Sequence, residues 1–401
     1  MSNKHMKPTG FEDITSDRIS SLPDEILLHI MSFMTAREAV QTCVLSTRWR
    51  YIWLCLRCLN TEICQFTSKK IFVRFMDNIL LRRGFVPLDS FSLIGWRDDV
   101  SLNHPRTNLW VCHAIRSNVR VLQIFEYHGL FDLDHSFFIS SHLKILNLRC
   151  VSTTALFIEK LFSGCPVLEE LSMVDCRVFA TKFSSSTLKK LTFISHTPHG
   201  EDCVHDDFED LVIDTPSLVS LHLEDLPLLN PCLVNVSSVV NASFRLDEES
   251  FASSDVNCNI ISALSNVTKL KLYFGLHNDM VSKVLKRDLW RCQTFNNLKT
   301  LFLGGWCIGT DLHALVYFLR RSPALEKLTV WIHQIGASGL PLKTDNLESK
   351  ATNISFNCEH LKKVKIRCPR GDKRAQNIVN VILANAISPP EIVIDQHTPW
   401  E

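Results

Sequence analysis

Long apolar segments are absent from this sequence, and their absence argues against a membrane or secreted protein. Aliphatic runs such as Ile26–Leu28 and Ile79–Leu81 fall far short of the roughly 20 apolar residues that a membrane-spanning helix needs. The first residues, MSNKHMKPTGFEDITSDR, are polar and lack the apolar core of a signal peptide. The sequence therefore predicts a protein of the nucleus, the cytoplasm or both.

An excess of charge of one sign is also lacking. Lys and Arg total 43 and Asp and Glu total 42, so no overall field attracts the chain to nucleic acid or to an anionic membrane. Glycine is scarce, with 13 of 401 residues, which is a poor background for phosphate-cradling loops. The stretch GGWCIG at 304–309 lacks the Lys-Ser/Thr pair of such a loop and is predicted to be a turn.

Cysteine is plentiful, with 15 residues, but no secretory signal accompanies it. We therefore interpret the cysteines as reduced thiols in apolar cores. Three of them have part of a metal-binding spacing, namely Cys55, Cys58 and Cys64. The loop 195–207 is the stronger alternative, with His196, His199, Cys203 and His205. Its turn-forming composition favours a solvated insertion, and we predict no metal and no other cofactor.

Residues 17–59 are predicted to form three short helices. Pro23 suits the first position of a helix that runs to about Met34. Thr35-Ala36-Arg37-Glu38 has the form of a capping box, which starts the second helix. Ser46 suits the cap of the third. Because the whole chain is longer than one hydrophobic core usually serves, further units or an elongated repeat must follow.

This helical unit carries more apolar surface than it can enclose. At about 40 residues it is too small to be stable without a metal, disulfides or a partner. In LPDEILLHIMSFM, at 22–34, apolar residues surround the helix instead of forming one stripe. Either the rest of the chain covers the excess, or a separate protein does. An apolar surface rimmed by charges is typical of a partner-binding site.

Residues 17–56 resemble the F-box, in the form common in plant proteins. The resemblance is carried, in order, by Leu22-Pro23, Ile26-Leu27, Ile30, Ala39-Val40, Val44-Leu45-Ser46, Arg48-Trp49-Arg50 and Trp53. It implies docking on the Skp-family adaptor of a cullin–RING (SCF-type) ubiquitin ligase. The predicted adaptor-binding residues are Leu22, Pro23, Ile26, Leu27, Ile30, Val44, Leu45, Trp49 and Trp53. Some of these must instead hold the small helical unit together.

An L-x-x-L-x-L phrase recurs behind this unit. It starts weakly at Leu88 and Val119 and clearly at Leu143, Leu168, Leu188, Leu218, Val267, Leu298, Leu325 and Leu361. This phrase is the strand of a leucine-rich repeat, so neighbouring copies are predicted to stack into a parallel sheet. Alternation should place Asn147, Ser172, Thr192 and His222 on the outward face. Helical returns are predicted at 153–163 and 310–321, and a degenerate copy near 236–244.

The last segment, 353–401, resembles the FBD-type segment that follows F-box and repeat regions in many plant proteins. Its pattern predicts a strand, a basic turn and an amphipathic helix from about Lys373 to Ala386, which closes the solenoid. The basic residues are Lys362, Lys363, Lys365, Arg367, Arg370, Lys373 and Arg374. They form either a solvated face of this cap or a contact for an acidic substrate or nucleic acid.

These patterns together predict an α/β protein. A disordered tail at 1–16 precedes the F-box at 17–59, a helical linker at 60–87, an irregular leucine-rich-repeat solenoid at 88–352 and the cap at 353–401. No catalytic constellation of Ser-His-Asp, Cys-His or paired carboxylates stands out. The predicted role is non-catalytic: the F-box would hold the Skp-family adaptor, and through it the cullin and RING subunits, while the repeats recruit a target protein. A non-degradative F-box scaffold and a repeat-based small-molecule co-receptor are the alternatives, and no binding of nucleic acid or membrane is predicted.

Overall fold

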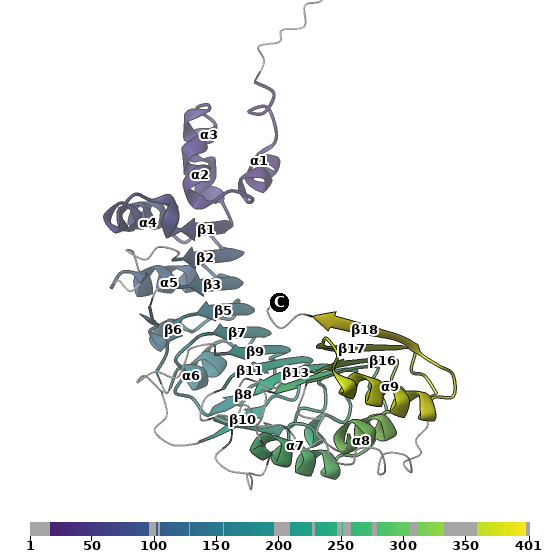
Figure 1. Cartoon of the computed structure of the whole chain (residues 1–401). Coiled ribbons are helices and arrows are strands. Elements are labelled where there is room, and N and C mark those ends of the chain that lie inside the picture. The colour runs from purple at the N-terminus through teal and green to yellow at the C-terminus, as the bar shows by residue number, and fades with distance from the viewer. Residues whose placement is uncertain are drawn as a thin grey trace, which may run out of the picture.

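A long parallel sheet runs through most of the molecule. The computed structural model describes residues 17–95, 102, 105–127, 129–154, 156–195, 209–226, 229–246, 251, 258–274, 279–304, 312–332 and 359–397. Within them lies a 13-stranded sheet that curves into an arc (Figure 1). Its strands are β1 (Cys58–Glu62), β2 (Ser90–Ile94), β3 (Val121–Phe125), β5 (Ile145–Arg149), β7 (Glu170–Val174), β9 (Lys190–Ile194), β11 (Ser220–Glu224), β13 (Asn241–Leu246), β14 (Lys269–Phe274), β15 (Thr300–Leu303), β16 (Lys327–Trp331), β17 (Lys363–Pro369) and β18 (Glu391–His397).

Each repeat strand buries the same two positions. In β5, Leu146 and Leu148 are buried, and Asn147 between them is partly exposed. Parallel pairing keeps this register along the sheet, because Leu146 lies opposite Leu122 of β3 and Leu171 of β7. Apolar ladders therefore run beneath the concave face from strand to strand. This arrangement confirms the predicted leucine-rich-repeat solenoid.

Helices and short strands cover the convex side of the arc (Figure 1). The helices are α4 (Lys69–Arg83), α5 (Thr107–Arg116), α6 (Phe157–Gly164), α7 (Asp279–Arg291), α8 (His313–Arg321) and α9 (Lys373–Asn385), with 3-10 turns η3 (Ile63–Gln65), η4 (His135–Phe137) and η6 (Ser262–Leu264). The short strands are β4 (Phe131–Asp132), β6 (Val151–Ser152), β8 (Lys182–Ser184), β10 (Glu209–Asp214) and β12 (Leu229–Val234). The helical returns predicted at 153–163 and 310–321 correspond to α6 and α8. The three-stranded sheet of β8, β10 and β12 was not indicated by the sequence pattern.

The sheet extends beyond both predicted limits of the repeats. The segment 60–87 is not a purely helical linker, because β1 already pairs in parallel with β2 and is followed by η3 and α4. At the other end, β17 and β18 of the predicted cap continue the same sheet. The predicted closing helix is present as α9. The cap is thus built as two further strands and a helix of the solenoid.

The N-terminal unit consists of short helical segments rather than three full helices. They are α1 (Asp24–Met31), α2 (Ala36–Gln41), η1 (Thr42–Val44), α3 (Trp49–Ile52) and η2 (Trp53–Cys55). The predicted capping box is confirmed: Glu38 N–H donates to Thr35 Oγ1 at 3.4 Å, and Thr35 N–H donates to Glu38 Oε2 at 2.9 Å. Ser46 is not the cap of the third helix. Its hydroxyl instead lies 3.1 Å from that of Ser20, and Arg48 occupies the cap position of α3.

This unit joins the sheet almost directly. η2 ends at Cys55 and β1 begins at Cys58. Arg83 of α4 is buried and donates to the carbonyl oxygens of Trp53, at 3.3 Å, and Leu54, at 2.9 Å. Burial lowers the pKa of Arg83 to about 10, so the guanidinium remains charged at neutral pH. The first repeat and the N-terminal unit therefore share a buried, charge-assisted contact.

Candidate functional site

The predicted adaptor-binding residues divide into buried and exposed groups. Leu27, Trp49 and Trp53 belong to the interior, with 0%, 2% and 5% of their surface exposed. Leu22 and Ile30 are half-buried. The exposed group is Pro23, Ile26, Val44 and Leu45. The structure thus separates apolar residues that hold the unit together from those that face outward.

Both buried tryptophans are satisfied within the chain. The Trp49 indole donates to Ser20 Oγ at 2.9 Å, and the Trp53 indole donates to the Arg50 carbonyl at 3.0 Å. A buried indole N–H needs such an acceptor, so these bonds fix the orientation of both rings. Their packing gives this small unit a core of its own. Because these two rings are buried, only the exposed apolar side chains are accessible to a partner.

The exposed apolar side chains lie on α1, on η1 and just beyond each. Ile26 is 46% exposed, Val44 83% and Leu45 60%. Phe33 is 80% exposed, and the sequence-based set of contact residues does not include it. Its spacing of seven from Ile26 is the signal that could have placed both on one helical face. Exposed apolar residues at this density in a short unit are unusual for a surface in contact with water alone.

Charged contacts position the helices that carry this surface. Arg48 forms an ion pair with Asp24 at the start of α1, and it also donates to the Ser20 carbonyl. At the start of α2, hydrogen bonds from Thr35 hold the pKa of the Glu38 carboxyl below its usual range. Both contacts place a negative charge at a helix N-terminus, where the helix dipole favours it.

The described residues contain no cluster of three or more His, Cys, Asp or Glu side chains suited to a metal ion. Cys55 and Cys58 are free thiols, and the Cys64 thiol donates to Glu62 Oε2 at 3.7 Å. Burial raises the pKa of Cys165 to about 11 and that of Cys176 to about 12, as expected for protonated thiols in a core. Most of the loop 195–207, including His196, His199, Cys203 and His205, lies outside the described residues, as does most of GGWCIG. No helix in the described ranges is long and apolar enough to cross a membrane.

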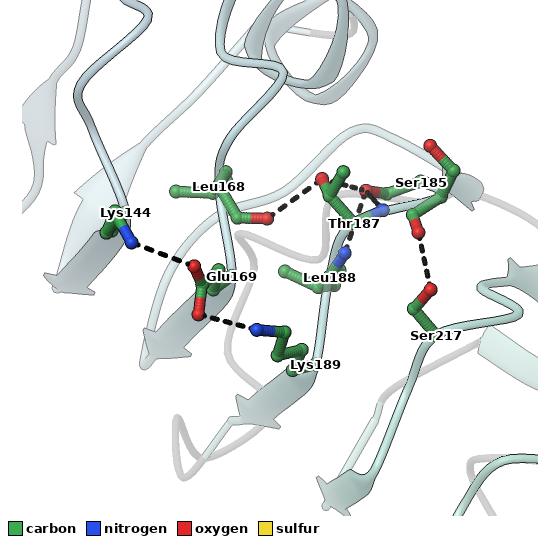
Figure 2. A network of polar contacts seen from close by, with 9 residues as sticks. Lys144, Leu168, Glu169, Ser185, Thr187, Leu188, Lys189 and Ser217 are labelled. Atoms are coloured by element: carbon green, nitrogen blue, oxygen red, sulfur yellow. Dashed lines mark hydrogen bonds and ion pairs between the residues drawn. The ribbon is translucent and has the colours of Figure 1, made fainter.

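A network of polar contacts at the starts of β5, β7 and β9 ties neighbouring repeats together. Figure 2 shows Glu169 between two lysines, with Lys144 Nζ at 3.1 Å and Lys189 Nζ at 2.9 Å. These contacts lower the pKa of the Glu169 carboxyl. Nearby, Thr187 donates to the Leu168 carbonyl at 3.1 Å (Figure 2). Each bond joins one repeat to the next, so the network helps to hold neighbouring strands in register.

The outward side chains of the concave face change in chemistry along the arc. The middle position of each strand is polar from β1 to β13, in the order Asn60, Ser92, Gln123, Asn147, Ser172, Thr192, His222 and Ser243, of which Ser92 is buried. From β14 to β17 the same position holds Lys271, Phe302, Thr329 and Lys365. At this middle position, the concave face therefore has polar side chains over β1 to β13 and mainly basic and aromatic ones over β14 to β17.

Comparison with known proteins identifies both units. Residues 19–60 match the F-box domain model, and residues 90–400 match the model described as "At1g61320/AtMIF1, LRR domain". The chain is 27% identical over 416 residues to F-box/LRR-repeat protein At3g58940 of Arabidopsis thaliana, an alignment that covers 92% of this chain and 63% of that protein. With F-box/LRR-repeat protein At3g58930 of the same plant, it shares 27% over 433 residues, covering 92% and 87%.

A further relative from Arabidopsis thaliana carries the third predicted feature in its name. F-box/FBD/LRR-repeat protein At5g22700 is 30% identical over 287 residues, covering 63% of this chain and 64% of that protein. The chain thus spans less than two thirds of the length of At3g58940 and of At5g22700.

Proposed function

The chain belongs to the family of F-box/leucine-rich-repeat proteins, and from this premise we propose that it is the target-recruiting subunit of an SCF-type ubiquitin ligase. In this proposal the F-box binds a Skp-family adaptor, which links it to the cullin and RING subunits. The concave face of the repeats holds the target protein. The assembly acts in the nucleus, the cytoplasm or both.

The exposed apolar surface of the F-box is the observation that carries the proposal. Ile26, Phe33, Val44 and Leu45 point away from the chain's own core, while Trp49 and Trp53 are buried in it. The rest of the described chain does not cover these four side chains. A separate protein that buried them would gain about 25 cal/mol for each Å² of apolar surface removed from water. The buried pair would support the interface from beneath.

The proposed mechanism is proximity and requires no catalytic residue in this chain. A target bound to the repeats is held beside a ubiquitin thioester that other subunits carry. Tethering raises the effective concentration of the target lysine near that thioester, so transfer no longer depends on a chance encounter. The chain contributes binding and orientation, and the covalent chemistry takes place elsewhere in the assembly.

The test is co-expression of the full chain with a Skp-family adaptor, followed by purification on a tag carried by the adaptor. We expect Val44→Glu/Leu45→Glu to reduce recovery of the chain at least roughly tenfold, because a buried, unpaired charge is costly at an interface. The matched control is Leu81→Glu/Ile139→Glu, which charges side chains that are 81% and 77% exposed outside the F-box.

The control variant should be recovered with the adaptor in the same amount as the wild type. Circular dichroism of each variant separates lost binding from lost folding. If the wild type does not associate with the adaptor, or if both double variants lose recovery equally, the proposed function is wrong.

A further inference from the structure

Basic side chains are concentrated on the concave face over β14, β15, β16 and β17. These four strands read KLKLYF, TLFL, KLTVW and KVKIRCP, without one Asp or Glu. The cations alternate with buried Leu, Val and Ile residues, which places them on the outward face, and they are Lys269, Lys271, Lys327, Lys363, Lys365 and Arg367. Because the whole chain has a formal net charge of only +1, this is a local concentration of charge.

Strand register brings these cations close together. Lys327 lies directly opposite Lys363, and Thr300 separates Lys327 from Lys269. Neighbouring strands are roughly 4.8 Å apart, so the charges of Lys327 and Lys363 lie within the Debye length of about 8 Å at physiological ionic strength, and Lys269 lies just beyond it, about 10 Å from Lys327. Like charges directly opposite one another destabilise a sheet. A bound anion would offset that repulsion.

Aromatic rings hold two of the cations in place. Trp331 is at the centre, with the Tyr273 ring centroid at 5.4 Å and the Phe302 centroid at 6.2 Å. Lys271 Nζ lies 5.4 Å from the Phe302 centroid, and Arg367 Cζ lies 5.9 Å from that of Trp331. Such cation–π contacts restrict long side chains before a ligand arrives, which lowers the entropy cost of binding.

Among the described residues, carboxylates neutralise only part of this surface. The edge strand β18 supplies two carboxylates, Glu391 and Asp395. Glu391 pairs with Lys363 at 3.2 Å, and Asp395 pairs with Lys365 at 3.0 Å and with Arg367 at 3.5 Å. Over the described ranges, no ion pair is found for the remaining three cations, which are Lys269, Lys271 and Lys327.

We propose that this basic–aromatic surface, formed by Lys269, Lys271, Phe302, Lys327, Trp331 and Lys365, binds an acidic segment of the target polypeptide. The inference rests on the proposed function and assigns a chemical class to the target. Carboxylates spaced along an extended chain can reach lysines on successive strands, and the polar side chains at the middle positions of β3 to β13 are left to bind the rest of the target through hydrogen bonds. Nucleic acid fits less well, because Lys271 and Arg367 already lie over the Phe302 and Trp331 rings on which bases would stack.

The test measures fluorescence anisotropy of labelled peptides with the full chain, bound to the adaptor where the two associate. The probes are a fluorescein-labelled decamer of glutamate and one of glutamine. The test variant is Lys269→Gln/Lys271→Gln/Lys327→Gln. The matched control is Lys70→Gln/Lys160→Gln/Lys182→Gln, which removes the same charge from exposed lysines on α4, α6 and β8.

We expect the glutamate decamer to bind in preference to the glutamine decamer, and its Kd to rise with salt. The test variant should weaken it roughly tenfold, since each exposed ion pair contributes up to a few-fold. The control should weaken it less than about twofold. Equal weakening by the two variants would overturn the proposal. So would tighter binding of a 20-nucleotide oligothymidine that the test variant abolishes, which would assign the surface to nucleic acid.

Adaptor binding is scored separately by co-purification. A chain that binds the acidic decamer but no adaptor would contradict the ligase role and leave the acidic specificity standing. A chain that binds the adaptor but not the acidic decamer would support the ligase role and contradict the acidic specificity.

Discussion

At the residue scale, apolar character alone does not tell a core side chain from a contact side chain. Trp49 and Val44 both fit the F-box pattern, yet the first is 2% exposed and the second 83%. The difference arises from long-range partners: the Trp49 indole finds its acceptor in Ser20, which precedes α1. A motif records which residue types recur, but not which of them the chain itself covers. The sequence alone therefore could not show which residues of the candidate site are buried and which are exposed.

At Gly164, the addition of a single methyl group should destabilise the protein. It ends α6, and a Cβ added there would collide with the backbone carbonyl oxygen of Phe138. Ser140 N–H donates to the Gly164 carbonyl at 2.8 Å, so the two segments cannot simply move apart. We expect Gly164→Ala to lower the free energy of unfolding by about 1–3 kcal/mol.

Urea denaturation measures this change, and Ser163→Ala is the control, because Ser163 is exposed on the same turn. Equal stability of the two variants would show that the segments can separate at little cost.

At the element scale, the sequence predicted the concave strands from β2 to β17 and missed β1, β18 and the strands of the convex side. The repeat phrase is visible because it buries the same positions every time, as Leu171 and Met173 do in β7. The convex returns follow no shared pattern: α6 is a helix, whereas β10 and β12 are strands. Their conformation is set by packing on neighbouring repeats, and single-sequence periodicity does not report that packing.

The capping box of α2 offers a prediction for one element. Thr35 accepts the Glu38 N–H and starts the helix that leads into η1, which carries the exposed Val44. We expect Thr35→Ala to lower the free energy of unfolding by about 1 kcal/mol, because the first turn loses its cap. Thermal denaturation followed by circular dichroism checks this, with the exposed Thr47→Ala as control. If Thr35→Ala is as stable as Thr47→Ala, the cap contributes no measurable stability, and packing against α1 and α3 is enough to hold α2 in place.

At the scale of the whole molecule, the sequence predicted separate units joined by a linker, and the structure shows them in contact. The boundary was misplaced because CLNTE, the sequence of β1, lacks the leucine-rich phrase. Its pairing with β2 depends on a neighbour about thirty residues away. In the predicted cap, the phrase at Leu361 was counted as a repeat and forms β17, whereas β18, which follows α9 and pairs with β17, was not predicted.

Arg83 couples the F-box to the first repeat, and its loss should weaken that coupling. Arg83→Met removes the donor from the Trp53 and Leu54 carbonyl oxygens while keeping much of the side-chain volume. We expect a loss of about 1–3 kcal/mol in the free energy of unfolding. In calorimetry the F-box should unfold before the repeats, as a separate transition.

Arg82→Met is the control, since Arg82 is the exposed neighbour on the same helix. One cooperative transition in both variants would contradict the role given to Arg83.

The short passage from η2 to β1 has a geometric consequence. Only Leu56 and Arg57 lie between these elements, and Arg83 also binds the end of the F-box. In the proposed assembly, these links would hold a protein on the F-box and another in the arc at a set distance and angle. With this geometry fixed, the shape of the protein bound in the arc would determine which of its residues come close to the proteins bound at the F-box. In the proposed ligase, inserting residues between η2 and β1 would change which target residues are modified, while the affinity for each bound protein stayed the same.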